Sequence, residues 1–297
     1  MESLPQILVV LGPTSSGKSA LAVELAKKYN GEIISADSRQ VYTGLNIGAG
    51  KITKKEMKGV PHHLLDVVSP KKVFTVQDFK THAERAIKKI LKNKKLPIIC
   101  GGTGFYIQSI VDNITFPDVL PNKTLRKELL TKSSYELFTI LTKLDPIRAR
   151  DIDPHNTIRL VRAIEIATAL GKVPSLQSEL QYESLQIGIE TSNETLKDKI
   201  YKRLLSRIKQ GMVAEATTLH HEGLSWKRME FMGLEYRYLA LFLQKKISKD
   251  EMIEKLTFET RKYARRQKTW FRKDKRIKWF PLESKKEIEK EIEKFLK

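Results

Sequence analysis

Residues 12–19 read Gly12-Pro-Thr-Ser-Ser-Gly-Lys18-Ser19 and follow a short apolar run at residues 7–11. Their spacing fits G-x-x-x-x-G-K-[ST], the phosphate-binding loop that connects a strand to a helix. Glycines let the backbone turn tightly and point its N–H groups at an anion, and the N-terminus of the following helix adds partial positive charge. The pattern therefore predicts a strand at residues 7–11 and a helix at residues 20–28.

The loop predicts a phosphate site without identifying the ligand. Lys18 is expected to contact phosphate oxygens, and the Ser19 hydroxyl is expected to help hold Mg²⁺. The candidate phosphate-binding residues are Gly12, Thr14, Ser15, Ser16, Gly17, Lys18 and Ser19.

The composition indicates a globular, strongly basic protein. Hydrophobic residues make up 40% of the 297 residues, which is enough for a core. The formal net charge of +20 favours a polyanionic partner through steering and counterion release. The alternative is a lysine-rich surface that has no such partner.

Cysteine content and hydropathy predict a cytoplasmic protein that has no membrane partner. Cys100 is the single cysteine, so no intrachain disulfide can form, and this suits a reducing compartment. No stretch approaches the ~18 apolar residues that a membrane-spanning helix needs. The N-terminal segment lacks the basic region of a signal peptide.

The segments after the loop alternate between strand and helix patterns. Strands are expected at residues 32–36, 61–68 and 96–100. Thr75-Val-Gln-Asp78 fits a capping box, and apolar residues at helical spacing follow it. This alternation predicts a parallel α/β sheet, in which ligands bind beyond the carboxyl ends of the strands.

The pattern changes to short helices after about residue 112 and returns to a strand pattern at residues 185–189. Two long helices are expected at residues 194–219 and 249–273, and the second carries a basic flank from Arg261 to Lys273. That flank predicts either a nucleic-acid contact or a packed helix with a charged outer side. The expected domains are a catalytic core at residues 1–115 and 191–297 and a helical insertion at residues 116–190.

Several polar residues are candidates for chemistry. On position alone, Asp37 could serve as a general base, a Mg²⁺ ligand or a helix cap. Thr103 lies among three glycines and could contact substrate or simply form a tight turn. Candidates for RNA or phosphate contacts, with solvated surface charge as the alternative, are Arg126, Arg159, Arg162 and Arg203. His62-His63 and His220-His221 lack partners at metal-ligand spacing, so we interpret them as structural.

Taken together, the motifs resemble the bacterial tRNA dimethylallyltransferases, also called tRNA isopentenyltransferases. The matching segments occur in the order of the family and span nearly the whole chain. They are residues 12–19, Ser35-Ala-Asp-Ser-Arg-Gln-Val-Tyr42, Pro61-His-His-Leu-Leu-Asp66, Gly101-Gly-Thr-Gly-Phe-Tyr106, Arg159-Leu-Val-Arg-Ala-Ile-Glu165 and Thr260-Arg-Lys-Tyr-Ala-Arg-Arg-Gln-Lys-Thr-Trp-Phe-Arg272.

The resemblance implies an α/β fold: a P-loop parallel-sheet core with helices on both faces and a small helical insertion domain. It implies transfer of a dimethylallyl group from dimethylallyl diphosphate to the exocyclic N6 amine of the adenosine immediately 3′ of the tRNA anticodon, releasing diphosphate. Mg²⁺ on Ser19 is the implied cofactor, and residues 12–19 would hold the diphosphate. The enzyme is expected to be a monomer.

The resemblance also implies roles for individual residues. The catalytic residues would be Asp37 as the base, Thr103 at the reactive centre and Arg203 on the diphosphate. Residues implied to contact the tRNA anticodon stem-loop are Asp37, Ser38, Arg39, Gln40, Thr103, Arg126, Arg159 and Arg162. The chain departs from the family pattern at Gly48-Ala-Gly-Lys-Ile52, at Ile158 and in Phe231-Met-Gly-Leu-Glu-Tyr236.

Two alternatives use the same residues differently. A small-molecule P-loop kinase would bind ATP at residues 12–19 and use the arginines of the insertion as a lid. An RNA-binding module would need no Lys18-Ser19 pair. The basic charge and the motif match along the whole chain favour prenyl transfer over both.

Overall fold

The computed structural model describes residues 3–174 and 179–297, which form two compact units. One unit combines the chain before residue 114 with the chain after residue 178, and the other comprises residues 114–178. The expected end of the insertion at residue 190 is wrong, because the strand that precedes it belongs to the sheet of the first unit. Within the expected range 116–190, residues 175–178 lie outside the described residues.

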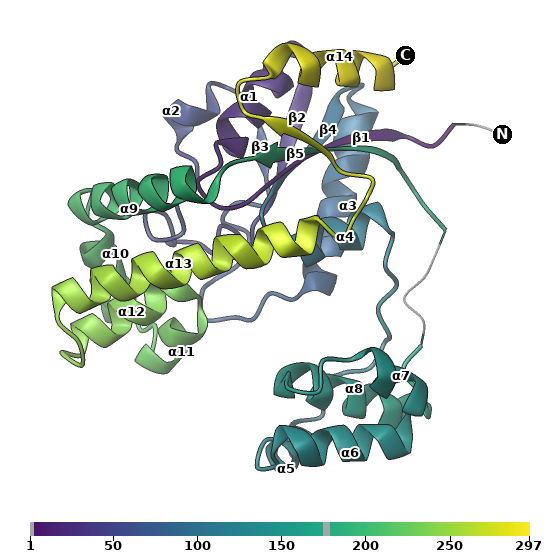
Figure 1. Ribbon diagram of the computed structural model, residues 1–297, viewed down its shortest axis with the longest axis vertical. Coiled ribbons are helices and arrows are strands. Elements are labelled where there is room, and N and C mark those ends of the chain that lie inside the picture. The colour runs from purple at the N-terminus through teal and green to yellow at the C-terminus, as the bar shows by residue number, and fades with distance from the viewer. Residues whose placement is uncertain (1–2, 175–178) are drawn as a thin grey trace. The chain divides into compact units, whose positions relative to one another are not determined.

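A parallel sheet forms the centre of the first unit (Figure 1). Among the described residues it has six strands in the order β3-β2-β4-β1-β5-β6, and every neighbouring pair is parallel. The strands are β1 (Gln6–Leu11), β2 (Gly31–Ala36), β3 (His62–His63), β4 (Leu96–Gly101), β5 (Glu183–Glu190) and β6 (Lys278–Pro281).

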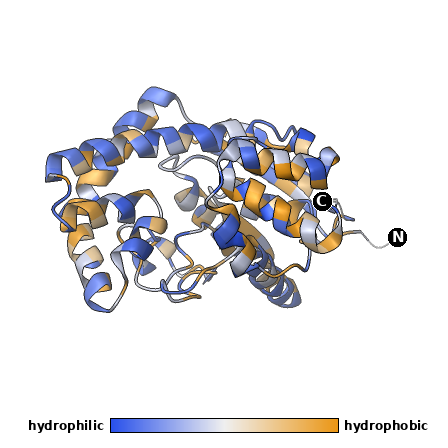
Figure 2. Ribbon diagram, turned by 90° about the horizontal axis from the view of Figure 1, so that it is seen from below, coloured by the Kyte–Doolittle hydropathy of each residue, from blue (hydrophilic) through white to orange (hydrophobic). Residues whose placement is uncertain are grey.

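Helices cover both faces of this sheet, as expected. Alternate residues of β1 point to opposite faces, so each face has its own apolar core. Helices α3 (Val76–Lys92) and α4 (Gly104–Val111) contribute to one core, and α1 (Lys18–Lys28) and α14 (Lys285–Phe295) contribute to the other. Figure 2 shows the same division, with hydrophobic stripes along helices whose other faces are hydrophilic.

Further helices of the first unit enclose a third core. The remaining helices of this unit are α2 (Lys54–Met57), α9 (Asn193–Lys209), α10 (Met212–His221), α11 (Trp226–Phe231), α12 (Leu234–Leu243) and α13 (Lys249–Phe271). Buried side chains from α9, α10, α12 and α13 surround the segment that follows β2.

Local signals explain where several elements begin and end. The expected capping box is confirmed, because Thr75 Oγ1 accepts from Asp78 N at 3.2 Å and the Asp78 carboxylate accepts from Thr75 N at 2.8 Å. The expected helix at residues 194–219 is wrong as a single element. Gly211, with φ 102°, adopts a left-handed conformation and separates α9 from α10.

The expected strand at residues 61–68 is also wrong over most of its length. Only His62 and His63 pair with β2. Leu64 and Asp66 have left-handed φ values of 63° and 55°, so the backbone turns away from the sheet. Leu64 is buried, but burial alone does not specify an extended backbone.

The unit at residues 114–178 is helical. Its helices are α5 (Lys123–Leu129), α6 (Ser134–Leu144), α7 (Pro146–Asp151) and α8 (Thr157–Leu170). They surround an apolar core centred on Leu137, Leu141 and Leu160. Helices α6 and α7 are separated at Asp145, which caps α7 by accepting from Arg148 N at 2.9 Å.

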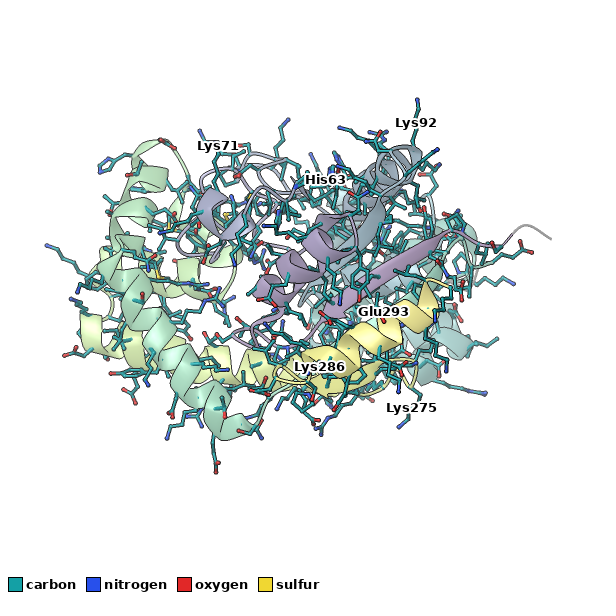
Figure 3. All side chains as sticks on the ribbon, turned by 90° about the horizontal axis from the view of Figure 1, so that it is seen from above. His63, Lys71, Lys92, Lys275, Lys286 and Glu293 are labelled. Carbon is teal, nitrogen blue, oxygen red and sulfur yellow. The ribbon has the colours of Figure 1, made fainter. Side chains whose placement is uncertain are left out.

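Charged side chains lie mainly on the surface. Figure 3 shows Lys71, Lys92 and Lys275 extending away from the ribbon. Within residues 3–174 and 179–297, no helix is long and apolar enough to cross a membrane.

Candidate active site

A cleft of about 930 Å³ lies in the first unit at the carboxyl ends of β1, β2 and β4. This is the edge at which ligands are expected to bind in a parallel α/β sheet. Its walls come from segments far apart in the sequence: the phosphate loop, the turn after β2, the loop after β4, and helices α9 and α13. Six lining residues that matter for the chemistry are Lys18, Ser19, Asp37, Gly102, Arg203 and Gln267.

The phosphate loop has the backbone that its sequence predicts. Gly12 and Gly17 have φ values of 153° and 92°, a region that glycine tolerates and other residues rarely adopt. Gly17 also lacks room for a side chain, since a Cβ there would lie 2.6 Å from Leu282. Helix α1 begins at Lys18, so its free N–H groups and positive dipole end border the loop.

Two cations of the cleft lack carboxylate partners among the described residues. Lys18 Nζ donates to Pro13 O at 3.1 Å, and Arg203 lies 3.5 Å from the hydroxyls of Thr14 and Ser15. Burial lowers the pKa of Lys18, and burial together with the charge of Arg207 lowers the pKa of Arg203 to about 10. Both shifts mean that the charged forms are poorly compensated, so the cleft attracts an anion.

Asp37 follows β2 and faces the same cleft. Its Oδ1 accepts from Arg39 N at 2.8 Å and from Gln40 N at 3.4 Å. These bonds restrain the carboxylate, while Oδ2 has no hydrogen-bond partner among the described residues and remains able to accept a proton. The helix-cap interpretation is wrong, because residues 38–40 form a turn and no helix begins there. The role of Asp37 as a base stays a prediction.

Thr103 and Ser38 join the loop after β4 to the turn after β2. Thr103 Oγ1 accepts from Ser38 N at 3.1 Å, and Thr103 N donates to Ala36 O at 3.1 Å. These bonds support the tight-turn interpretation, while the expected contact of Thr103 with substrate stays a prediction.

Gln40 and Arg39 have partners that the sequence did not predict. Gln40 Oε1 accepts from Ser35 Oγ at 3.2 Å, and its Nε2 donates to Gly50 O at 3.2 Å. Arg39 lies against Gly233, where a Cβ would be 2.7 Å from its Nε. Both side chains border the cleft, and their expected contact with a nucleic acid stays a prediction.

At residues 48–52, where the chain departs from the family pattern, the backbone leaves room for a second arginine, Arg207. Gly50 has φ 57°, and a Cβ there would lie only 1.4 Å from Arg207 Nη2. Arg207 Nη1 approaches Gly48 O at 3.4 Å and Glu235 at 3.7 Å. Arg207 is a cleft residue that we did not single out, although it stands four residues after Arg203 and so on the same face of α9.

Glu215 is a second residue that the sequence did not reveal. Its carboxylate accepts from three consecutive backbone N–H groups, those of Asn46, Ile47 and Gly48, at 2.7–3.0 Å. It also accepts from the Tyr236 hydroxyl at 2.7 Å. This carboxylate holds the turn that carries Gly50. The available signals were the glycine-rich turn, whose N–H groups need an acceptor, and Tyr236 in a segment that departs from the family pattern.

The histidines have structural partners, and Cys100 is buried against Lys18. His63 Nε2 lies 2.7 Å from Glu32, and His220 stacks on Trp226 at a centroid distance of 3.5 Å. Burial raises the pKa of the Cys100 thiol to about 11, which keeps it protonated and unreactive at neutral pH. Among the described residues, no three His, Cys, Asp or Glu side chains are grouped as metal ligands.

The three insertion arginines divide into two kinds. Arg126 forms a two-pronged ion pair with buried Glu165, with both distances 2.7 Å. Arg162 donates to Val119 O at 2.8 Å and also approaches Glu165. Arg159 is exposed at the start of α8, and its side chain forms no hydrogen bond or ion pair with the described residues. Of the three, Arg159 is the one whose guanidinium is fully available to a partner.

Helix α13 is a packed helix with a charged outer side, and its contact with a nucleic acid stays a prediction. Met252, Leu256, Ala264, Gln267 and Phe271 are buried, so one face packs on the core. The opposite face carries a basic flank of residues that are largely exposed: Arg261, Lys262, Arg265, Arg266, Lys268, Arg272 and Lys273. A packed helix with a cationic outer side results, and that side is suited to a phosphate backbone.

Comparisons with known proteins identify the family of the chain. The family model described as IPP transferase matches residues 40–274. A tRNA dimethylallyltransferase of Thermoanaerobacter sp. (strain X514) is 40% identical over 306 residues, covering 98% of this chain and 97% of that protein.

Two solved structures also match. A tRNA delta(2)-isopentenylpyrophosphate transferase from Staphylococcus epidermidis has a TM-score of 0.72 at 37% identity, covering 98% of this chain and 99% of that one. A eukaryotic dimethylallyltransferase acting on tRNA has a TM-score of 0.77 at 25% identity, covering 90% and 69%. The resemblance that the motifs indicated is confirmed, and the chain belongs to the IPP transferase family, that of the tRNA dimethylallyltransferases.

Proposed function

We propose that this chain transfers a dimethylallyl group from dimethylallyl diphosphate to the N6 amine of the adenosine immediately 3′ of a tRNA anticodon. One observation carries the proposal: two poorly compensated cations, Lys18 and Arg203, share a cleft with the restrained carboxylate of Asp37. The cations suit a departing diphosphate, and the carboxylate suits a nucleophile that must lose a proton.

The chemistry follows from the weakness of the nucleophile. An adenine amine delocalises its lone pair into the ring, so it needs deprotonation as its new bond forms. The N6 lone pair bonds to C1 of the donor, and the C1–O bond breaks with its electrons going to the diphosphate. Oδ2 of Asp37 accepts the N6 proton, and the Thr103 hydroxyl lies beside this reaction. Such base assistance is typically worth ~10²–10⁴-fold in rate.

The leaving diphosphate requires charge stabilisation. Backbone N–H groups of the phosphate loop, the N-terminus of α1, Lys18 and Arg203 are all arranged around one site. Because these groups are positioned before the reaction, they stabilise the developing charge at little reorganisation cost. Arg207 adds a further cation beside Arg203.

Mg²⁺ is the proposed cofactor, and the residues present fit it. Ser19 exposes its hydroxyl to the cleft at the position where a phosphate loop supplies a magnesium ligand. Magnesium usually takes few protein ligands and fills its sphere with phosphate oxygens and water, which suits a cleft without a carboxylate cluster. When bound, the ion neutralises charge on the diphosphate.

The acceptor is proposed to lie along cationic surfaces of both units. The flank of α13 and the free guanidinium of Arg159 are the strongest candidates for phosphate contacts. We further propose that the chain acts as a monomer in the cytoplasm. The cleft is built from one chain, and a single buried cysteine suits a reducing compartment.

Replacing Arg126 and Arg159 separately should give different phenotypes. Arg126→Ala leaves the buried Glu165 carboxylate without its main partner, so it should lower stability by about 1–3 kcal/mol. Arg159→Ala should leave stability unchanged, weaken tRNA binding and reduce the salt slope by about one unit. Thermal unfolding and tRNA binding at several salt concentrations measure both effects. An Arg159 variant with the wild-type salt slope would contradict the proposed contact.

A ligand titration tests the donor and separates this proposal from a P-loop kinase. In Mg²⁺, pyrophosphate and dimethylallyl diphosphate should each raise the melting temperature, with about 2.7 kcal/mol of stabilisation at 100 times Kd. Chelating the Mg²⁺ with EDTA should weaken both effects. ATP that binds more tightly than dimethylallyl diphosphate would instead favour the kinase.

A further inference from the structure

A buried carboxamide connects the phosphate loop to the loop that carries Thr103. Gln267 of α13 is only 6% exposed. Its Oε1 accepts from Thr14 N at 2.9 Å, and its Nε2 donates to Gly102 O at 2.8 Å. The two bonded groups are 88 residues apart in the sequence, and one side chain holds them both.

The packing around the bridge leaves no room for a side chain at Gly102 or Gly104. A Cβ at Gly102 would lie 2.3 Å from Gln267 Nε2, so the glycine is needed for the close approach. One turn further along α13, Trp270 packs so closely on Gly104 that a Cβ there would lie 2.2 Å from its ring. Helix α13 therefore holds the whole loop after β4 against the phosphate loop.

Each end of the Gln267 bridge leads to a group that the reaction uses. On one side, the Thr14 hydroxyl lies 3.5 Å from Arg203, beside the site proposed for the diphosphate. On the other side, Gly102 precedes Thr103, whose hydroxyl accepts from Ser38 N next to Asp37. The carboxamide thus connects the donor side of the cleft to the acceptor side.

We propose that Gln267 is a positioning residue that sets the separation between the donor diphosphate and the acceptor amine. This inference rests on the proposed transfer reaction. It concerns how tightly the release of diphosphate is coupled to attack by the amine. With the bridge intact, the amine is the group that reaches C1 of the donor. When the bridge is lost, the acceptor side moves away and water gains access to C1.

The competing reaction is hydrolysis of the donor by water. A water oxygen bonds to C1, the C1–O bond to the diphosphate breaks, and the water loses a proton. The products are a five-carbon alcohol, diphosphate and a proton, and the tRNA is unchanged. Uncoupling therefore appears as more pyrophosphate released than dimethylallyl groups found on tRNA.

Two substitutions probe the bridge. Gln267→Met keeps the length of the side chain and removes both hydrogen bonds, while Gln267→Glu keeps the acceptor for Thr14 N and loses the donor to Gly102 O. Gln186→Met is a matched control, since Gln186 is 3% exposed and donates at 3.4 Å to Asp274 outside the cleft. Melting curves and pyrophosphate titrations identify any variant that has lost its fold.

We expect both Gln267 variants to reduce kcat on the order of 10- to 100-fold, because small displacements of reacting groups are costly. The ratio of pyrophosphate to prenylated tRNA should rise to at least about twofold, while it stays at one in wild type and in Gln186→Met. Pyrophosphate affinity and the KM for the donor should change less than about threefold.

Other outcomes would overturn the inference. A ratio that stays at one in both folded Gln267 variants would mean that the bridge does not couple the two sides. A loss of rate explained entirely by a higher donor KM would make Gln267 part of the diphosphate site alone. Wild-type protein that transfers no dimethylallyl group would refute the proposed function itself, which distinguishes the two failures.

Discussion

Replacing Asp37 by asparagine should lower kcat on the order of 10²–10⁴-fold while leaving the affinities for pyrophosphate and tRNA almost unchanged. Asparagine retains an oxygen that can accept from Arg39 N and Gln40 N, so the local backbone should survive. It cannot accept the proton that N6 must lose. Single-turnover rates at saturating donor and tRNA measure the chemical step without the contribution of binding.

Asp37→Ala serves as the matched comparison, because it removes both the base and the acceptor that holds the turn. If Asp37 acts as the base, the two variants should be similarly slow, and the alanine variant should additionally lose stability of about 0.5–1.5 kcal/mol. An asparagine variant with nearly normal rate would show that the carboxylate serves only to hold the turn after β2.

Replacing Lys18 by methionine should reduce kcat on the order of 10²–10³-fold and weaken pyrophosphate binding as well. Lys18 has no carboxylate partner among the described residues, so its charge is available to the diphosphate. Burial lowers the pKa of Lys18, so this side chain loses its charge at a lower pH than an ordinary lysine, whose pKa is 10.5. In the wild type we therefore expect donor affinity to fall as the pH rises through this lowered pKa.

Lys28→Met is the matched control, since Lys28 lies at the other end of α1 and pairs with Glu289 on the surface at 2.7 Å. An exposed ion pair of this kind contributes little to stability, so this variant should retain full activity. Equal losses of activity in the two variants would indicate a general effect of lysine removal, and the role assigned to Lys18 would fail.

Much of the fold could be predicted because its signals are local. Four strands of the central sheet, β1, β2, β4 and β5, were recognisable as short apolar runs, and the capping box at Thr75 marked the start of α3. The failures occurred where one backbone conformation decided the outcome. Gly211 splits a helical pattern in two, and Leu64 turns an apolar run out of the sheet. Neither conformation leaves a signature in hydrophobic periodicity.

The candidate site was predictable only where motifs mark it. Lys18 and Asp37 stand at loop and strand ends that the pattern identifies, and both line the cleft. Glu215 and Gln267 were missed because their bonds join residues more than 160 positions apart. Gln267 lies on the buried face of α13 among apolar residues, and a buried polar side chain needs a partner.

The analysis of the reaction products tests most directly the proposal that residues 12–19 hold a departing diphosphate while an adenine amine attacks the donor. The protein is incubated with tRNA, Mg²⁺ and dimethylallyl diphosphate, and the tRNA is then digested and its nucleosides are weighed. We expect an adenosine carrying one added five-carbon group, formed in equal amount to released pyrophosphate and located next to the anticodon. Unmodified tRNA, with ATP consumed when it is supplied instead, would contradict the proposal.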